Sequence, residues 1–499
     1  MLVVRAVEDI PERSIKKDDK FQLYIVDAHH HMGREGSHKN SPSGAYDFYA
    51  LLWFELQRMA KDQIEKDLLL FEPLEVVPPD LPARMFSSKE NWARMNHGWL
   101  VDRTIAFSYS DDYSKSDSPD VPSFRVSNDK IAGWTTRAPH SSRLIGFARV
   151  DPKDALNGSH NIPVKEIERA VKVLGLRGLK LHPLAQLFVD EITADYMKDI
   201  MKCAGELGIP VIMDTRNIRT VLRIRELIES MRGVKKYRES LRGLAVILAH
   251  CGMSPGNTRF YEVLRDPVFF GETSSLHGKD IPILFGMASE RIEAPGGRWS
   301  EKILFGTDYS FLSVQAAELI LYLISRSFEG SLTDAQRILG GNALILAQRP
   351  FKSGNGVTLK PKGVICEECK PEAMNDLEKS ILSLLGKEWD ISSLDFLIPP
   401  RHTWPRIRSL EEGGYNGVHF NSYVLTLRHS GKETHVWIRE IPGGLMSCSI
   451  LGTIGKPTLD TAEYAAQKLS PELSDLLRKN TVTVRTTEEL VASVLRILT

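Results

Sequence analysis

The chain has 499 residues, of which 42% are hydrophobic and 26% are charged, with 64 Lys and Arg residues against 64 Asp and Glu residues. This length allows two or three domains or one large barrel with an added module, and the formal net charge of zero argues against nucleic acid or an anionic membrane as the main partner. Five irregularly spaced cysteines, with neither a signal-peptide core nor a long apolar stretch, favour a reduced, cytoplasmic protein.

Eight short apolar segments in the first two thirds of the chain end in polar side chains. Most are rich in Val, Ile, Leu and Phe at nearly every position, which is typical of strands covered on both faces in a parallel sheet. The predicted strand regions are FQLYIVDAHHH (21–31), VDRTIAFSYSD (101–111), LIGFARVDP (144–152), LRGLKLHP (176–183), GIPVIMDT (208–215), LAVILAHCG (244–252), PVFFGETSS (267–275) and KILFGTDYS (302–310).

Helical patterns lie between several of these strands, at residues 164–175, 194–208 and 218–233. Alternating strands and helices predict an α/β fold, here a (β/α)8 TIM-like barrel with its active site at the carboxyl ends of the strands. The alternative is an open doubly wound sheet. That fold is expected to carry a G-x-G-x-x-G turn, and none follows a predicted strand.

A long insertion, about residues 32–100, separates the first two predicted strands. Within it, residues 46–71 predict one or two amphipathic helices rich in aromatic side chains. Such a segment can form a lid or substrate wall at a barrel mouth. It can equally form additional core or a dimer surface, and we expect the protein to be a homo-oligomer, most simply a dimer.

The alternation stops after residues 338–347, so we expect the barrel domain to cover residues 1–350. A linker rich in Gly, Pro, Lys and Ser follows at residues 351–363, and a small C-terminal α+β module of unassigned role covers residues 364–499. The elements expected in this module are a helix near 371–386, a hairpin at 417–441 turning at Ser430 and Gly431, and helices near 459–479 and 486–498.

The stretch VDAHHH is the first candidate for chemistry. Because side chains alternate along a strand, His29 and His31 share one face and His30 points away. Two imidazoles on one face suit a divalent metal, zinc first, with manganese or iron as alternatives. Asp27 lies on the same face and could orient a ligand or join the site. A solvated histidine run is the alternative.

Other predicted strands also end in residues of the ligand type. Lys180 and His182 follow the fourth strand, Asp214 the fifth, His250 the sixth and Asp308 the eighth. In a parallel barrel these ends meet at one mouth, where a metal acidifies water and a neighbouring Asp or His moves protons.

Two cysteine patterns are given less weight. Cys251 follows His250 and is expected to face away from the mouth as a core thiol. The CEEC stretch (366–369) has the spacing of half a zinc site, but no second C-x-x-C follows, so we expect no metal there.

Taken in order, these motifs resemble the amidohydrolase superfamily, in particular its amidohydrolase-related branch. The matching pieces are VDAHHHMG, IGFARVDP, GLKLHPLAQ, AGELGIPVIMDT, LAHCG, ILFGTDYSF and ILGGNALIL, which together span roughly residues 20–350. The resemblance implies that His29 and His31 bind metal. It also implies that Asp308 binds metal and acts as general base, and that His250 is a second-metal ligand or an acid/base or substrate contact.

The chain departs from the family pattern at the end of the fifth strand, where Asp214 stands in place of the usual histidine. Aspartate can still bind a divalent metal, with a ligand field shifted toward oxygen, and His182 could compensate as a ligand. Some superfamily members carbamylate the lysine that corresponds to Lys180. We favour a mononuclear site in which His29, His31, Asp214 and Asp308 bind the metal, Asp308 and His250 are catalytic, and Lys180 and His182 contact substrate.

Three functions remain open on this basis. The first is a metal-dependent hydrolase acting on an amide, a lactone or a cyclic C–N or C–O bond of a small polar substrate. The second is a nonoxidative decarboxylase of an aromatic or unsaturated carboxylic acid that uses the same site. The third is a non-catalytic scaffold with a decayed site, against which the His29, His31, His250 and Asp308 set argues.

Overall fold

The computed structural model describes most of the first 347 residues and five later strands. The described residues are 2–13, 15–35, 38–76, 100–110, 121–136, 140, 143–156, 161–292, 298–309, 313–347, 389–397, 421–429, 432–441, 445–452, 481–484 and 492. The predicted linker, the CEEC stretch and, apart from Ala492, the predicted C-terminal helices lie outside them. No helix in the described ranges combines the length and apolar character needed to cross a bilayer.

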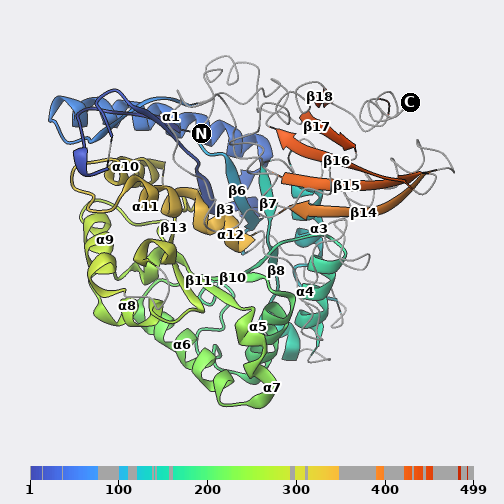
Figure 1. Cartoon of the computed structure of the whole chain (residues 1–499). Coiled ribbons are helices and arrows are strands. Elements are labelled where there is room, and N and C mark those ends of the chain that lie inside the picture. Colours follow the sequence, from blue (N-terminus) through green and yellow to red (C-terminus); the bar gives the residue numbers. More distant parts are fainter. Residues whose placement is uncertain are drawn as a thin grey trace.

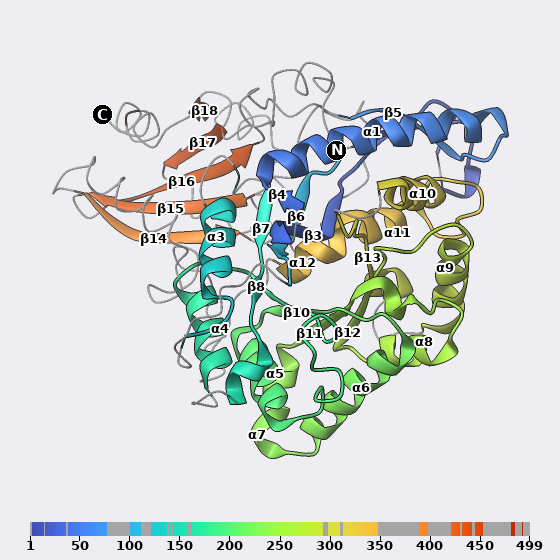
Figure 2. The ribbon, with the colours of Figure 1, turned by 180° about the vertical axis from the view of Figure 1, so that it is seen from behind.

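Two parallel sheets form the centre of the described structure (Figures 1 and 2). One has the strand order β13-β12-β11-β10-β9-β8, and in the other β3, β6 and β7 run parallel with the short β4 at the edge. Each predicted strand region overlaps at least one of these strands. Their bounds are Val26–Glu35 (β3), His38–Asn40 (β4), Arg103–Ser108 (β6), Leu144–Gly146 (β7), Ala148–Arg149 (β8), Leu179–Leu181 (β9), Pro210–Met213 (β10), Ala245–Leu248 (β11), Phe269–Glu272 (β12) and Ile303–Leu304 (β13).

Two predicted strands are divided in the structure. The region at 21–31 splits into Lys20–Leu23 (β2), which pairs antiparallel with Leu2–Ala6 (β1), and β3, which pairs parallel with β6. The region at 144–152 splits at Phe147, whose N–H donates to Ala106 O while the next residue begins pairing with β9. A continuous apolar run specifies burial but not which neighbour each half pairs with.

Hydrogen bonds also connect β3 to the segment after β13. The N–H of Ala28 donates to Phe305 O (2.9 Å), that of Asp308 to His29 O (2.9 Å), and that of His31 to Tyr309 O (3.1 Å). The two sheets are therefore linked on this side as well as at Phe147.

The strands are buried on both faces, as their composition predicts. In β11, Ala245 and Ile247 belong to one buried cluster, and Val246 and Leu248 to the other. The cluster that contains Ala245 and Ile247 lies on one face of the parallel strands. The cluster that contains Val246 and Leu248 lies on their other face, where the strands pack against the outer helices.

Most of the helices lie on the outside of the strands, whereas α12 lies near the centre and packs against β3 and β13 (Figures 1 and 2). Gly208 ends one of them in the left-handed conformation (φ 72°), and the Asn217 side chain caps the next by accepting from the Thr220 N–H. The bounds of these helices are Arg125–Thr135 (α3), Ile162–Lys172 (α4), Asp195–Leu207 (α5), Ile218–Arg232 (α6), Lys235–Arg238 (α7), Thr258–Leu264 (α8), Asp280–Arg291 (α9), Ser313–Leu323 (α10), Leu332–Gln336 (α11) and Asn342–Ala347 (α12).

The described part of the segment between the first two predicted strands contributes core. It contains one helix, Pro42–Glu65 (α1), which packs against α10, and a strand, Phe71–Val76 (β5), which pairs antiparallel with β1. Tyr49 and Trp53 are among the buried side chains of α1. The three-stranded sheet β2-β1-β5 was not predicted from the sequence.

A five-stranded antiparallel sheet lies in the C-terminal part of the chain, in the order β14-β15-β16-β17-β18. The register pairs His429 with Lys432, so the predicted hairpin forms, although its turn lies outside the described residues. The strand bounds are Trp389–Leu397 (β14), Asn421–His429 (β15), Lys432–Ile441 (β16), Leu445–Gly452 (β17) and Thr481–Val484 (β18).

The buried carboxylate of Asp334 connects α11 with the segment before β13. It accepts hydrogen bonds from Ser300 Oγ (2.6 Å), Ser331 Oγ (2.6 Å) and Ser331 N (2.8 Å), and it pairs with Arg298 (2.7 Å). Burial by itself raises the pKa of Asp334, but these donors together lower it below its usual value.

A lowered folded-state pKa means that Asp334 stabilises the fold above the unfolded pKa of about 3.9, and that this contribution is lost as the pH falls through the folded value. We expect Asp334→Asn to lower the free energy of unfolding at pH 7 by about 2 kcal/mol and to flatten its decline between about pH 5 and pH 2. Urea denaturation across this range measures both effects. Asp190→Asn, at an exposed position, is the matched control. An equal acid dependence in the Asp334 variant and the wild type would contradict the prediction.

Candidate metal centre and active site

The strand ends bring His29, His31 and Asp308 together in a buried group. Asp308 Oδ1 lies 3.4 Å from His29 Nε2 and 3.3 Å from His31 Nε2, and the two Nε2 atoms are 3.3 Å apart. A tetrahedral zinc ion with bonds of about 2.0–2.1 Å separates its ligand atoms by roughly 3.3–3.4 Å. The spacing of these three atoms therefore fits one metal ion.

The hydrogen bonding of this group also suits a cation. Asp308 Oδ1 and His31 Nδ1 are buried and have no hydrogen-bond partner among the described residues. Electron-rich atoms placed this close repel one another unless a positive charge lies near them. The ammonium of Lys180, 3.1 Å from His29 Nε2, supplies one such charge, so a metal ion bound here would have this side chain as a neighbour.

Burial keeps the two imidazoles neutral, as metal ligation requires. It lowers the pKa of His31 to about 4 and holds that of His29 well below its usual value. Although burial by itself raises the pKa of Asp308, the neighbouring histidines His29, His31 and His250 lower it, so this carboxylate is ionised at neutral pH.

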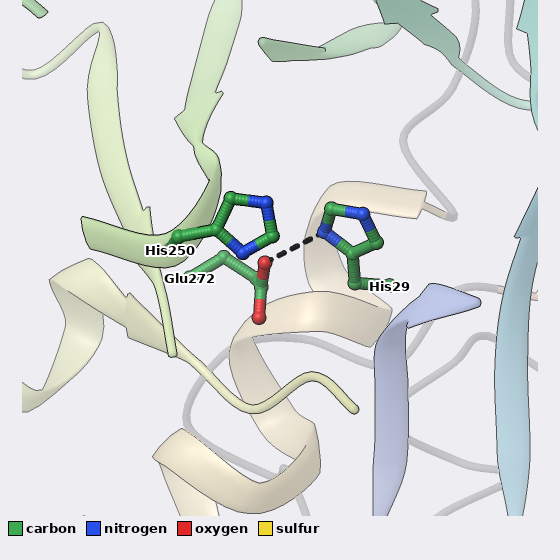
Figure 3. Close-up of side chains that lie close together, drawn as sticks. All are labelled: His29, His250 and Glu272. Carbon is green, nitrogen blue, oxygen red and sulfur yellow. Dashed lines mark hydrogen bonds and ion pairs between the residues drawn. The ribbon is translucent and has the colours of Figure 1, made fainter. Parts of the chain in front are cut away.

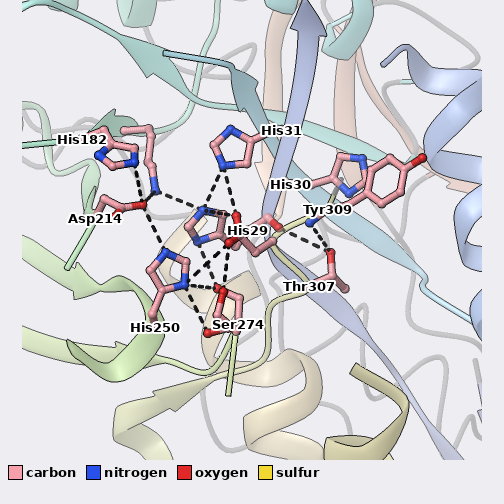
Figure 4. Close-up of polar contacts among 12 residues, drawn as sticks. His29, His30, His31, His182, Asp214, His250, Ser274, Thr307 and Tyr309 are labelled. Atoms are coloured by element: carbon pink, nitrogen blue, oxygen red, sulfur yellow. Dashed lines mark hydrogen bonds and ion pairs between the residues drawn. The ribbon is translucent and has the colours of Figure 1, made fainter. Parts of the chain in front are cut away.

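Asp214 lies at the centre of an ion-pair network that adjoins this group through Lys180 (Figure 4). Its Oδ2 is 3.2 Å from Lys180 Nζ, 3.2 Å from His250 Nε2 and 3.5 Å from His182 Nε2, and its Oδ1 accepts from Arg216 Nε at 3.0 Å. Two groups of the described residues have the spacing of metal ligands: His29, His31 and Asp308 form one, and His29, His250 and Glu272 form the other. Asp214 belongs to neither group. Its observed partners are cations and imidazoles, and its role as a ligand stays a prediction.

His182 lies at the outer edge of this network. Its Nδ1 accepts a hydrogen bond from the Ala185 N–H (3.2 Å), which leaves Nε2 facing Asp214. Burial lowers the pKa of His182 to about 3, so the ring is neutral at pH 7. It neighbours the metal-ligand candidates without belonging to their groups.

His250 stands between the two networks. Its Nε2 faces Asp214, and its Nδ1 lies 2.9 Å from Ser274 Oγ and 4.0 Å from Asp308 Oδ2. Burial by itself lowers the pKa of His250, but the carboxylates of Asp214, Asp308 and Glu272 together raise it above its usual value. His250 is therefore the imidazole of this cluster best suited to hold a proton.

Several residues in and beside the site have positive φ angles, which orient their side chains. His250 (φ 59°), Cys251 (φ 46°), Ser275 (φ 66°) and Asp308 (φ 51°) all adopt the left-handed conformation. Such residues cost about 1–3 kcal/mol each and concentrate at functional sites. Cys251 is a buried free thiol, as predicted, and its Sγ contacts the backbone O of Glu272 (3.3 Å).

His30 points away from the metal group, as strand alternation predicts, and it makes buried contacts of its own. It is fully buried, its Nδ1 contacts Tyr49 OH (2.9 Å) and Asp27 Oδ2 (3.2 Å), and its ring stacks on Tyr309. Asp27 does not reach the metal group either. It accepts from the Thr307 N–H (2.9 Å) and hydroxyl (2.6 Å), which joins β3 to the segment that carries Asp308.

Four polar residues of the site were missed in the sequence. Glu272 and Ser274 follow the seventh predicted strand, whose polar ending GETSS was the available signal. Arg149 ends β8 fully buried and donates to Ser110 Oγ (3.0 Å). Burial is the main cause of the lowered pKa of His31 and of Lys180, and the positive charge of Arg149 adds to it. Arg216 gave no sequence signal, because it lies beyond the strand end.

Residues 119–346 match the family model described as Amidohydrolase. Similar solved structures include 4-oxalomesaconate hydratase from Rhodopseudomonas palustris (17% identity, 65% of this chain and 95% of that one covered, TM-score 0.38). Another is an uncharacterized TIM-barrel protein from Bordetella bronchiseptica (15% identity, 65% and 98% covered, TM-score 0.37). No curated protein matches the sequence. The family match includes Lys180, Asp214, His250 and Asp308.

Proposed function

We propose that the protein is a metal-dependent hydrolase of the amidohydrolase superfamily, whose family model matches residues 119–346. Its substrate is a small polar molecule with an amide, a lactone or a cyclic C–N or C–O bond. One observation carries the proposal: His29 Nε2, His31 Nε2 and Asp308 Oδ1 lie within 3.4 Å of one another in a buried group, with the spacing of ligands around one ion.

When bound, a divalent metal, zinc first, supplies a Lewis acid that brings the pKa of water toward neutrality. His29, His31 and Asp308 would hold it. Asp308 Oδ2, which accepts from Ser275 Oγ (3.0 Å), takes the proton of the attacking water, and His250 returns a proton to the leaving group. Lys180 holds the negative charge that develops on the substrate oxygen.

The proposal includes one closed (β/α)8 barrel. Two observations support closure: Phe147 links β6 and β8, and the His29–Asp308 and His31–Tyr309 backbone hydrogen bonds link β3 to the segment after β13. Closure would bring the carboxyl ends of all eight strands to one mouth.

A nonoxidative decarboxylase is the second candidate function, and the cations around the metal group favour it. Lys180 and Arg149 are fully buried, and Arg216 Nη2 lies 3.9 Å from Asp308 Oδ2. A guanidinium suits the carboxylate of such a substrate. Release of carbon dioxide from hydroxybenzoates, measured beside hydrolysis of lactones and cyclic amides, distinguishes the two activities.

Metal content tests the metal function directly. We expect the purified protein to hold close to one Zn, Mn or Fe per chain by elemental analysis, and His31→Ala to lose most of it, because that variant removes one of three donors. His277→Ala, at an exposed histidine, is the control and should keep the metal. A wild-type protein with only traces of metal, together with full activity in His31→Ala, would rule out the proposal.

A further inference from the structure

Glu272, at the end of β12, lies between two histidines (Figure 3). Its Oε2 is 2.8 Å from His29 Nδ1 and accepts from Ser274 Oγ at 2.7 Å, and its Oε1 accepts from the Ser274 N–H. Both Glu272 and His29 are fully buried. Resting on the proposed metal function, we propose that Glu272 is a positioning residue that fixes the tautomer and ring orientation of the metal ligand His29.

The proton count gives the tautomer. The N–H and the hydroxyl of Ser274 both donate to Glu272, as they would to a carboxylate. The ionised carboxylate only accepts, so the His29 Nδ1 atom that faces Oε2 at 2.8 Å carries a hydrogen. A neutral imidazole then has its lone pair on Nε2. That atom lies 3.3 Å from His31 Nε2 and 3.4 Å from Asp308 Oδ1, so the lone pair is available in the metal group. A carboxylate behind a histidine ligand also raises the basicity of its metal-binding nitrogen.

Ser274 couples the two histidines through this carboxylate. Its single hydroxyl hydrogen is donated to Glu272, so its oxygen accepts from His250 Nδ1 at 2.9 Å. His250 Nε2 is thereby turned toward Asp214. One serine thus orders the metal ligand His29 through Glu272 and the catalytic candidate His250 directly.

The space for Glu272 depends on a glycine. A Cβ added at Gly306 would lie 2.1 Å from Glu272 Oε1, which is closer than real Cβ atoms approach, and 3.0 Å from His29 Cβ, which is a tight contact. Gly306 comes two residues before Asp308. Gly306→Ala should therefore displace the carboxylate without removing its charge, and it provides an independent perturbation of the same contact.

Co2+ titration of the metal-stripped protein, followed by the visible absorption of the bound ion, tests the role of Glu272. We expect Glu272→Gln to weaken Co2+ binding about 10- to 100-fold and to change the absorption bands, since the tautomer of one ligand is no longer fixed. Gly306→Ala should weaken binding in the same direction. Glu262→Gln, at an exposed position on α8, is the matched control and should bind like the wild type.

Thermal unfolding of the metal-free variants separates positioning from a general loss of structure. If Glu272→Gln does not fold, the Co2+ titration is carried out on Ser274→Ala, which leaves the carboxylate charge in place. The expected loss of Co2+ affinity is smaller for this variant. A folded Glu272→Gln or Ser274→Ala that binds Co2+ with wild-type affinity and an unchanged spectrum would overturn the positioning role alone. A wild-type protein that binds no Co2+ would overturn the proposed function and the inference together.

Discussion

Asp308→Asn is expected to lower the turnover number about a thousandfold, on the substrate that the activity screen identifies. The amide keeps an oxygen close to His29 and His31 but cannot accept the proton that the proposed mechanism assigns to Asp308. The charged carboxylate is also the single anion among the three proposed ligands, so metal affinity should fall as well. Measuring kcat at saturating metal separates the lost base from the lost ligand.

Asp195→Asn provides the control for this substitution, because that side chain is 89% exposed on the first turn of α5. It should keep wild-type turnover and metal content. Near-normal turnover of metal-loaded Asp308→Asn would remove Asp308 from the role of general base and transfer it to His250, the other group placed to move a proton.

Asp214→Ala is expected to lower the free energy of unfolding of the metal-free protein by about 3–5 kcal/mol. Lys180 is fully buried, and its Nζ pairs with Asp214 Oδ2 at 3.2 Å. Removing the carboxylate leaves a charge in the interior without this partner, and His250 loses its contact at the same time. Urea denaturation of the metal-stripped protein measures the loss.

The double variant Lys180→Met, Asp214→Leu tests the cause of that loss. Replacing both charges with apolar side chains removes the unpaired ammonium, so the double variant should be more stable than Asp214→Ala alone. Metal content distinguishes the two roles of Asp214. Full stability with lost metal in Asp214→Ala would make it a ligand, as the sequence predicts, and would contradict the ion-pair account.

The strand positions and the H-x-H pair could be predicted because they depend on local patterns. Alternation along a strand places His29 and His31 on one face wherever the strand lies, and their Nε2 atoms are 3.3 Å apart. The same rule sent His30 to the other face, but it gave no sign of the buried contacts with Asp27 and Tyr49 that His30 makes there. Those contacts join residues from separate elements.

Which site residues contact one another could be seen only in the folded structure. Asp214 is predicted from the sequence as a metal ligand, and in the structure its carboxylate is surrounded by Lys180, His250 and Arg216. The sequence signal for Glu272 was only the polar ending of the seventh predicted strand. Its contact with His29 spans 243 positions along the chain, and no local pattern encodes a pairing at that separation.

The sequence by itself determined the eight strand regions, the burial of both strand faces and which polar side chains stand at the strand ends, because residue type and spacing act over a few positions. Tertiary structure alone decided that residues 21–31 divide between two sheets, that Glu272 and Ser274 stand behind His29 and His250, and that a Cβ at Gly306 would displace that carboxylate. These outcomes depend on which distant segments pack together. That choice is made by the free energy of the whole core, to which every segment contributes.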